Sequence, residues 1–205
     1  MPAILAGFLT GLSLIVAIGA QNAYVLRQGL AKTQVTPVVV VCATSDAVLI
    51  VAGIAGLGVV VEAHPMALTV LTWFGAAFLT GYGLLALRRA LHPDGLSAGG
   101  SVVTGTGAAI AVALALTWLN PHVYLDTVLL LGSVGSGYGS PGRWWFAGGA
   151  AAASVVWFTG LGYGSRHLTR FFTSTRSWRI LDLVIAAVML AIAASLVVTA
   201  LNGPA

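Results

Sequence analysis

Charged side chains are scarce in this chain of 205 residues: Asp, Glu, Lys and Arg together make up only 7% of it. A soluble domain carries roughly 25%. Nine basic and five acidic residues cannot cover a water-facing surface of this size, and 59% of the chain is apolar. With a mean hydropathy of +0.99, the composition excludes a soluble enzyme, a nucleic-acid-binding protein and a disordered chain. The remaining solvent is the lipid bilayer.

Two further absences narrow the function. The single cysteine, Cys42, forbids an intrachain disulfide and a CxxC redox pair, which excludes a membrane thiol–disulfide carrier. Neither an HExxH zinc motif nor a Walker loop is present, so we expect no enzyme activity, and any pumping must use an ion gradient. No cluster of His, Cys and acidic residues indicates a bound metal, and nothing indicates another cofactor.

Six apolar runs are long enough to cross a bilayer as helices, because a span needs about 20 residues at a rise of 1.5 Å each. They lie near residues 3–26, 37–60, 66–87, 105–132, 144–165 and 180–201. Helices are expected because an isolated strand would leave backbone groups unpaired in lipid, and the runs lack the alternation of barrel strands. The first run has no basic residue before it, which favours a retained helix over a signal peptide. We therefore predict an all-α membrane protein with a single transmembrane domain over residues 1–205.

The longest connection, residues 88–104, is rich in Gly, Ser and Pro and divides the chain into residues 1–87 and 105–205. Each half has three spans, and with an odd number of spans the second copy must insert upside down. Tyr24 and Tyr124, 100 residues apart, follow corresponding interruptions of the first and fourth runs. The predicted fold is therefore six transmembrane helices arranged as two inverted three-helix repeats, with helices 1 and 4 broken.

Lysine and arginine are distributed unevenly between the connections. Eight of the nine lie in the connections 1–2, 3–4 and 5–6, and the opposite side has Arg143 alone. The eight are Arg27, Lys32, Arg88, Arg89, Arg166, Arg170, Arg176 and Arg179. Because cytoplasmic loops carry the excess of basic residues, these three connections are predicted to face the cytoplasm and both termini to lie outside. If Arg27 belongs to the broken first helix and not to a connection, seven of the remaining eight basic residues still favour the same orientation.

Two acidic residues lie well inside the apolar runs, Asp46 near the middle of the second and Asp126 in the fourth. A charge at the bilayer centre costs about 2.5–3.5 kcal/mol, so an ionisable residue inside a span is a functional candidate by default. We interpret the two carboxylates as a cation site and proton relay facing one water-filled cavity. The alternative is a structural role, as a partner of Arg27 or as a helix cap at the membrane edge.

The first and fourth runs are interrupted by polar residues, at 19–22 and 117–122. Pro121 removes a backbone donor and clashes with the preceding turn, which predicts a helix break. Unwound backbone at this depth must be covered by protein or line a cavity. The helical segments that restart near Ala23 and at Pro121 present positive dipole ends that could hold a substrate carboxylate. The alternative is an ordinary proline kink packed by neighbouring helices.

These features define the candidate site. Amide side chains near the breaks can pair freed backbone groups or bind a polar ligand, and the two tyrosines either line a cavity or belong to the interfacial aromatic belt. The candidate substrate-binding residues are Asp46, Asp126, Gln21, Asn22, Asn120, Pro121, Tyr24 and Tyr124. The candidate proton-coupling residues are Asp46, Asp126 and His122, although a histidine packed against the backbone is an equal alternative.

Other residues are expected to have structural roles. Asp182 begins the sixth run, where an acid suits the helix dipole. Tryptophans at the ends of runs are expected to anchor the protein at the membrane interface; these are Trp144, Trp145 and Trp178. Two glycine pairs at GxxxG spacing, beginning at Gly7 and Gly160, allow close contact between helices.

Four segments resemble the lysine exporter family of basic amino acid exporters. They are GFLTGLSLIVAIGAQNAYVLRQGL at 7–30, SDAVLIVAGIAGLG at 45–58, ALTWLNPHVYLDTVLLLGSVG at 115–135 and SWRILDLVIA at 177–186. The resemblance spans essentially the whole chain, and its most specific blocks are GAQN and LNPHVYLDT. It implies export of lysine or arginine across the bacterial cytoplasmic membrane, driven by the proton gradient and membrane potential. It also implies that Asp46, Asp126 and the break at Asn120 and Pro121 form the functional core.

The leading hypothesis is therefore a proton-coupled exporter of cationic amino acids. The alternatives are an exporter of neutral amino acids or of a metal cation with the same architecture, and a membrane-embedded interaction protein without transport. A metal site would need more acids, histidines or sulfur near Asp46 and Asp126 than the sequence offers. Expected partners are a basic amino acid, protons and the lipid bilayer, with no nucleic acid. The sequence does not decide between lysine and arginine, or between a monomer and a homo-oligomer.

Overall fold

The computed structural model describes residues 2–16, 19–57, 65–91, 105–171 and 174–202, and within these ranges it contains helices and no strand. The first half comprises α1 (Ala3–Ile15), α2 (Ala20–Ala31), α3 (Val35–Ala52) with the π-helical turn η1 (Gly53–Leu57), and α5 (Pro65–Leu91). The second half comprises α6 (Thr106–Trp118), α7 (Pro121–Val123), the π-helical η3 (Tyr124–Leu130), α8 (Leu131–Ser136), α9 (Gly139–Gly164), the 3-10 segment η4 (Ser165–Phe171) and α10 (Thr175–Asn202).

Four stretches are each long and apolar enough to cross a membrane: Val35–Gly56, Thr69–Leu91, Gly139–Thr169 and Thr175–Leu201. Two bent pairs pass the same test together. The axes of α1 and α2 differ by 82°, and the axis of α6 differs by 61° from that of the helix over Pro121–Ser136. If each bent pair is one span, the described residues contain six, in the order of the six apolar runs. The prediction of an all-helical membrane protein is confirmed.

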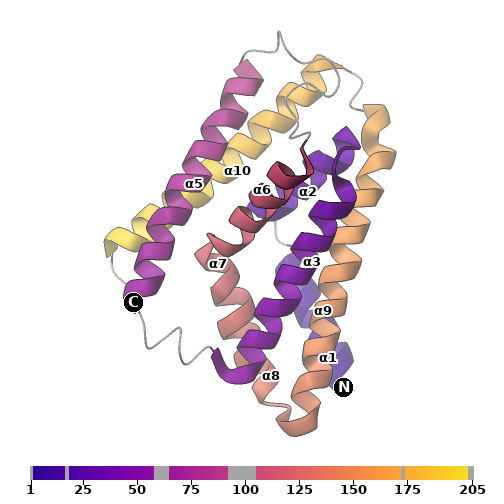
Figure 1. Cartoon of the computed structure of the whole chain (residues 1–205), viewed down its shortest axis with the longest axis vertical. Helices are drawn as coiled ribbons and strands as arrows, with labels where there is room; N and C mark the ends of the chain where they lie inside the picture. Colours follow the sequence, from indigo (N-terminus) through magenta and orange to yellow (C-terminus); the bar gives the residue numbers. More distant parts are fainter. Residues whose placement is uncertain (1, 17–18, 58–64, 92–104, 172–173, 203–205) are drawn as a thin grey trace.

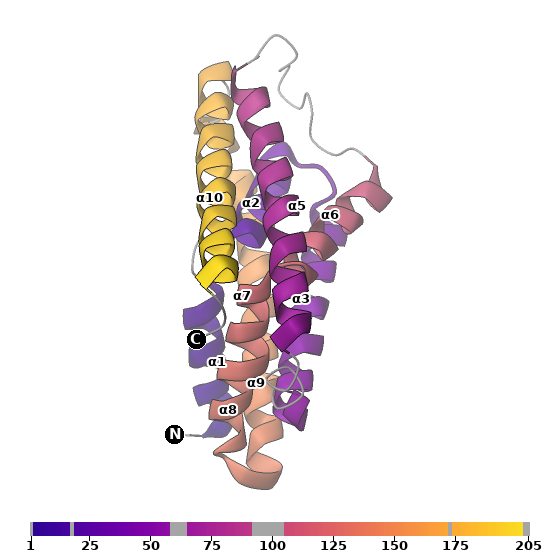
Figure 2. The ribbon, with the colours of Figure 1, turned by 90° about the vertical axis from the view of Figure 1, so that its left-hand side faces the viewer.

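The helices form two groups joined by the segments next to the breaks. Helix α5 packs lengthwise against α10, while α1 and α3 both pack against α9 (Figures 1 and 2). Helices α2 and α6 contact members of both groups, and α7 contacts α5; Figure 1 shows α6 and α7 running between α5 and α3. The breaks therefore lie where the two groups meet.

Glycines allow the backbones of α1 and α9 to approach closely. A Cβ atom added at Gly7 would lie 2.0 Å from the carbonyl oxygen of Phe146, and one added at Gly149 would lie 1.9 Å from that of Ile4. The contact expected of the Gly7 pair is therefore present. The second pair differs, because a Cβ added at Gly160 or Gly164 would meet no described atom within 4 Å.

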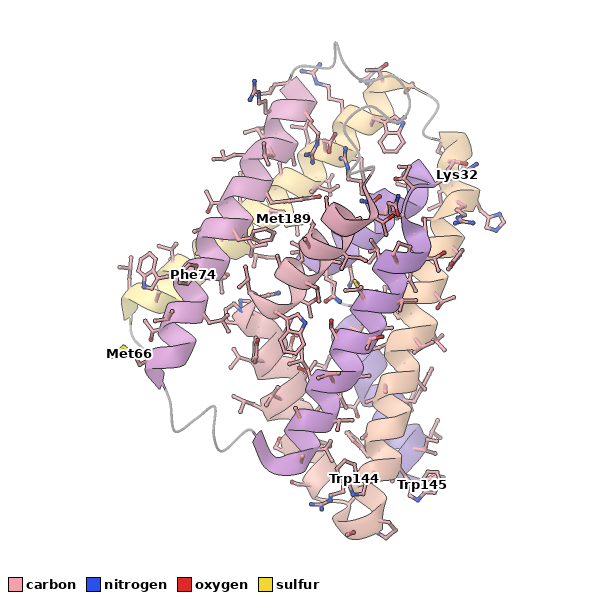
Figure 3. All side chains as sticks on the ribbon, in the orientation of Figure 1. Lys32, Met66, Phe74, Trp144, Trp145 and Met189 are labelled. Carbon is pink, nitrogen blue, oxygen red and sulfur yellow. The ribbon has the colours of Figure 1, made fainter. Side chains whose placement is uncertain are left out.

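The outer surface of the bundle is apolar, as expected for lipid contact. Met66 and Phe74 point outward from α5, whereas Met189 of α10 is buried (Figure 3). Trp144 and Trp145 are exposed at one end of the molecule and Lys32 lies near the other, which fits an interfacial role for the two tryptophans (Figure 3). Trp178 was expected to share this role, but it is 8% exposed and packs in the core.

Candidate functional site

The first break separates α1, which ends at Ile15, from α2, which begins at Ala20. Asn22 connects the two helices and a third. Its Nδ2 donates to the carbonyl oxygen of Ile15 at 2.6 Å, and its Oδ1 accepts from Nε1 of Trp157 in α9 at 3.1 Å. The last carbonyls of a helix have no partner within the helix, so this amide satisfies one of the groups that the break frees.

The second break is stabilised by three neighbouring side chains. Asn120 has an extended backbone, and its Oδ1 accepts from the backbone N–H of His122 at 3.2 Å, which makes it the N-cap of the restarted helix. Pro121 occupies the first helical position, where no donor is needed. The hydroxyl of Tyr124 donates to the carbonyl oxygen of Trp118 at 3.0 Å, pairing a group at the end of α6. The local sequence thus explains why the helix stops and restarts here.

A π-helical segment, η3, follows this second break and carries Asp126. The π-helix is rare and occurs frequently at functional sites, because its extra residue per turn redirects side chains. Helix α5 also approaches the break closely: a Cβ atom at Gly75 would lie 2.0 Å from the carbonyl oxygen of Leu119. The break is therefore enclosed by protein on the α5 side, as backbone at membrane depth requires.

A cavity of about 250 Å³ lies between the two breaks. Its lining residues are Leu14, Ile15, Gly19, Ala20, Gln21, Asn22, Asp46, Asn120, His122, Val123, Asp126, Thr127, Leu131, Phe158 and Ile192. The structure thus brings together six of the residues singled out from the sequence: Gln21, Asn22, Asp46, Asn120, His122 and Asp126. They come from both halves of the chain.

The two carboxylates of the cavity have different surroundings. Asp46 in α3 is 3% exposed, and its Oδ2 accepts from the hydroxyl of Ser154 in α9 at 2.9 Å. Asp126 is half-buried. Within the described residues neither carboxylate forms an ion pair, because the two ion pairs found there both involve Asp182. The alternative in which Arg27 partners Asp46 or Asp126 is therefore wrong.

Gln21 adds a buried amide donor to the cavity. Its Nε2 is buried and has no hydrogen-bond partner among the residues that the structure describes. A buried amide donor without an acceptor costs free energy, roughly 1–3 kcal/mol, so an oxygen-bearing ligand in the cavity would recover this loss. The cavity can thus bind a small molecule that has both a cationic group and oxygen acceptors.

Three candidate residues do not line the cavity. Pro121 and Tyr124 shape the second break, as described above. Tyr24 lies beside a second pocket further along α2, where its hydroxyl donates to the carbonyl oxygen of Ala109 at 3.3 Å and accepts from Gln28 at 2.9 Å. The structure assigns these three side chains contacts with protein.

Two residues of α9, Ser154 and Trp157, were not singled out from the sequence, although each bonds a cavity residue. A hydroxyl in the middle of an apolar span was the available signal for Ser154.

The role expected for Asp182 is also wrong. It is the eighth residue of α10, beyond the first turn where a dipole acts, and it is fully buried in an ion cluster with Arg27 and Arg89.

Bent pairs of apolar helices around an acidic cavity are typical of transport proteins. Comparison with known families agrees: the family model for the LysE type translocator matches residues 12–200. The chain belongs to this family, and the resemblance to lysine exporters is confirmed.

Curated relatives cover nearly the full length. The chain is 44% identical over 193 residues to a putative amino-acid transporter of Mycobacterium tuberculosis, covering 94% of this chain and 96% of the relative. It is 35% identical over 229 residues to the lysine exporter LysE of Corynebacterium glutamicum, covering 96% and 98%. It is 40% identical over 188 residues to the arginine exporter protein ArgO of Salmonella enteritidis, covering 91% and 89%. No solved structure matches the chain.

Proposed function

We propose that this protein is a secondary transporter that exports cationic amino acids, L-lysine, L-arginine or both, from the bacterial cytoplasm. The observation that carries the proposal is the cavity between the breaks, where Asp46 and Asp126 line one space and neither is neutralised by a described basic residue. The names of the relatives, a lysine exporter and an arginine exporter, point to the same substrates.

The size and chemistry of the cavity suit a single amino acid. Pockets for drug-sized ligands measure roughly 300–1,000 Å³, and the cavity, at about 250 Å³, is smaller. The carboxylates would accept charge-assisted hydrogen bonds from an ammonium or guanidinium group. The Nε2 of Gln21 and the helix starts at Ala20 and Pro121 would face the substrate's own carboxylate.

The proton gradient and the membrane potential are proposed to drive export, with Asp46, Asp126 and His122 as the proton-coupling residues. An uncompensated charge inside the bilayer is costly. When a cationic substrate leaves the cavity, a proton would therefore replace it on the carboxylates. Substrate and proton would compete for the same anions, so exchange needs no separate coupling site.

We also propose the inverted arrangement of the two halves, with both termini outside. The packing supports it, because α3 contacts α9 and α5 contacts α10, and each of these pairs joins corresponding helices of the two halves. An in-plane two-fold axis would relate the members of each pair. The side with Lys32 and Arg88 would then face the cytoplasm.

Transport into inverted membrane vesicles tests the proposed function. Vesicles from cells that make the protein are supplied with labelled lysine, arginine, threonine or a divalent metal ion, and vesicles without the protein are the control. We expect lysine or arginine to accumulate when a proton gradient is imposed and not after an uncoupler is added. Accumulation of threonine or of the metal, without lysine or arginine, would overturn the proposal.

A further inference from the structure

A second pocket, of about 400 Å³, lies along α2 beyond the acidic cavity. Residues of α2, α5 and α6 line it. Helix α2 contributes residues to both spaces: Asn22 lines the acidic cavity and Arg27 lines the second pocket. These two residues are five positions apart, which corresponds to about 8 Å along the helix axis. The two spaces are therefore neighbours that share one helix as a wall.

The second pocket differs from the first in the sign of its charge. Arg27 and Arg89 line it, and Asp182 of α10 pairs with both guanidinium groups. Asp182 Oδ1 accepts from Arg27 Nη1, and it lies 3.3 Å from both Nε and Nη2 of Arg89. Two cations, the buried Arg27 and the partly exposed Arg89, thus share one carboxylate, and no other described acid forms an ion pair with them. The cluster carries an excess of one positive charge.

Arg89 is the member of the cluster that can reach a ligand. Its side chain is 18% exposed, against 3% for that of Arg27 and 0% for that of Asp182. Its Nη2, although within ion-pair distance of Asp182, makes no hydrogen bond with any residue that the structure describes. A guanidinium has five donors in a planar fork that fits a carboxylate, so Arg89 keeps binding capacity after pairing with Asp182.

The other walls of the pocket are aromatic and apolar. The rings of Tyr24 and Tyr82 meet edge to face at 6.1 Å, Phe78 lies 6.3 Å from Tyr82, and Arg89 lies over the Tyr82 ring at 5.8 Å. Ala77, Leu85 and Val112 complete the apolar part of the lining. Such walls suit an alkyl chain that ends in a cation, because aromatic faces attract cations.

We infer that this pocket is a second amino-acid site, which binds the α-carboxylate of a cationic amino acid before the molecule moves to the acidic cavity. The inference rests on the proposed function, and it adds a residue, Arg89, that recognises the anionic end of the substrate. The single excess positive charge matches one carboxylate. Because α2 lines both spaces, Arg89 and the amides at the start of α2 would act on the same molecule in turn.

Binding to purified protein in phosphatidylcholine nanodiscs tests this inference. The two ligands are lysine and lysinamide, in which a neutral amide replaces the carboxylate. Arg89→Gln removes the charge and leaves Arg27 and Asp182 as a balanced pair, so the variant should fold, and its thermal unfolding is measured alongside. Arg88→Gln is the matched control, because Arg88 is the preceding residue of the same helix and does not line the pocket.

Arg89→Gln should weaken lysine binding about tenfold or more, as expected for loss of a charge-assisted hydrogen bond, and change lysinamide binding less than about twofold. Arg89→Lys, which keeps the charge, should recover part of the lysine affinity, and Arg88→Gln should affect neither ligand. Equal loss of both ligands in Arg89→Gln, or no loss of lysine binding, would overturn the inference.

Three outcomes separate this inference from its alternatives. If the wild-type protein binds neither lysine nor arginine, the proposed function fails and the inference fails with it. If Arg89→Gln changes lysine binding only after phosphatidylglycerol is added to the nanodiscs, the pocket binds an anionic lipid headgroup and the inference is wrong. Wild-type binding of lysine with an unchanged Arg89→Gln variant would overturn the second site alone.

Discussion

Replacing Asp182 with asparagine should destabilise the protein more than removing either arginine of the ion cluster. Asp182→Asn leaves the buried Arg27 and the partly buried Arg89 beside each other without an anion. Breaking a buried pair by removing one partner costs about 3–5 kcal/mol. Arg27→Gln should cost less, because Asp182 keeps Arg89 at 3.3 Å. Arg89→Gln should cost least, about 1 kcal/mol or below, because Arg89 is partly exposed and a balanced pair remains.

The assay is unfolding of the purified protein in mixed micelles, with helicity followed as the fraction of denaturing detergent rises. The expected order of stability is wild type, Arg89→Gln, Arg27→Gln and Asp182→Asn. The double variant Arg27→Gln/Asp182→Asn should recover part of the loss seen in Asp182→Asn, because it leaves one unpaired cation instead of two. The coupling free energy follows from the double-mutant cycle.

Two results would refute this reasoning. If Asp182→Asn is as stable as the wild type, the carboxylate does not hold the two cations together. If Arg89→Gln loses as much stability as Asp182→Asn, then Arg89 is not the exposed and partly unpaired member of the cluster. Either result would also remove the structural basis of the second amino-acid site.

Three further predictions concern the break, the helix packing and the orientation. Asn120→Ala should lower the unfolding free energy by about 0.5–2 kcal/mol through loss of the N-cap, and Asn120→Ser, which keeps an acceptor, should lower it less in the same detergent titration. Gly7→Val should lower the unfolding free energy clearly, whereas Gly160→Val should leave it within about 0.5 kcal/mol of the wild-type value. The reason is that, of the two glycines, only Gly7 faces nearby backbone. Equal losses of unfolding free energy would contradict the α1–α9 packing. A cysteine at exposed Thr175, in protein with Cys42→Ala, should react with an impermeant thiol reagent in inverted vesicles, and labelling of intact cells would overturn the proposed orientation.

The sequence predicts features that depend on local chemistry. Pro121 removes a backbone donor, so the helix end near Trp118 follows from residue type alone, and the structure places the N-cap at the adjacent Asn120. The cavity residues Asp46 and Asp126 were found because charge inside an apolar run is costly. Each of these signals lies within one span and needs no knowledge of its neighbours.

Features that depend on which helices pack together could not be predicted. Arg27, Arg89 and Asp182 are far apart in the chain, and they meet only because α2, α5 and α10 converge. Gly7 and Gly160 begin identical GxxxG spacings, yet only the first faces a neighbouring backbone. The spacing shows that close contact is allowed, and the packing decides whether it occurs.

Lysine and arginine transport by Asp46→Asn and Asp126→Asn variants tests the central claim most directly. Each substitution keeps the shape and removes the charge, and asparagine at position 46 still offers an oxygen to Ser154. With labelled substrate, inverted vesicles and matched protein levels, both variants should lose transport while remaining folded and inserted. Asp→Glu at either position should retain part of the activity, because the charge stays and only its reach changes. Transport at near wild-type rates by both Asn variants would contradict the proposal that these carboxylates bind the substrate.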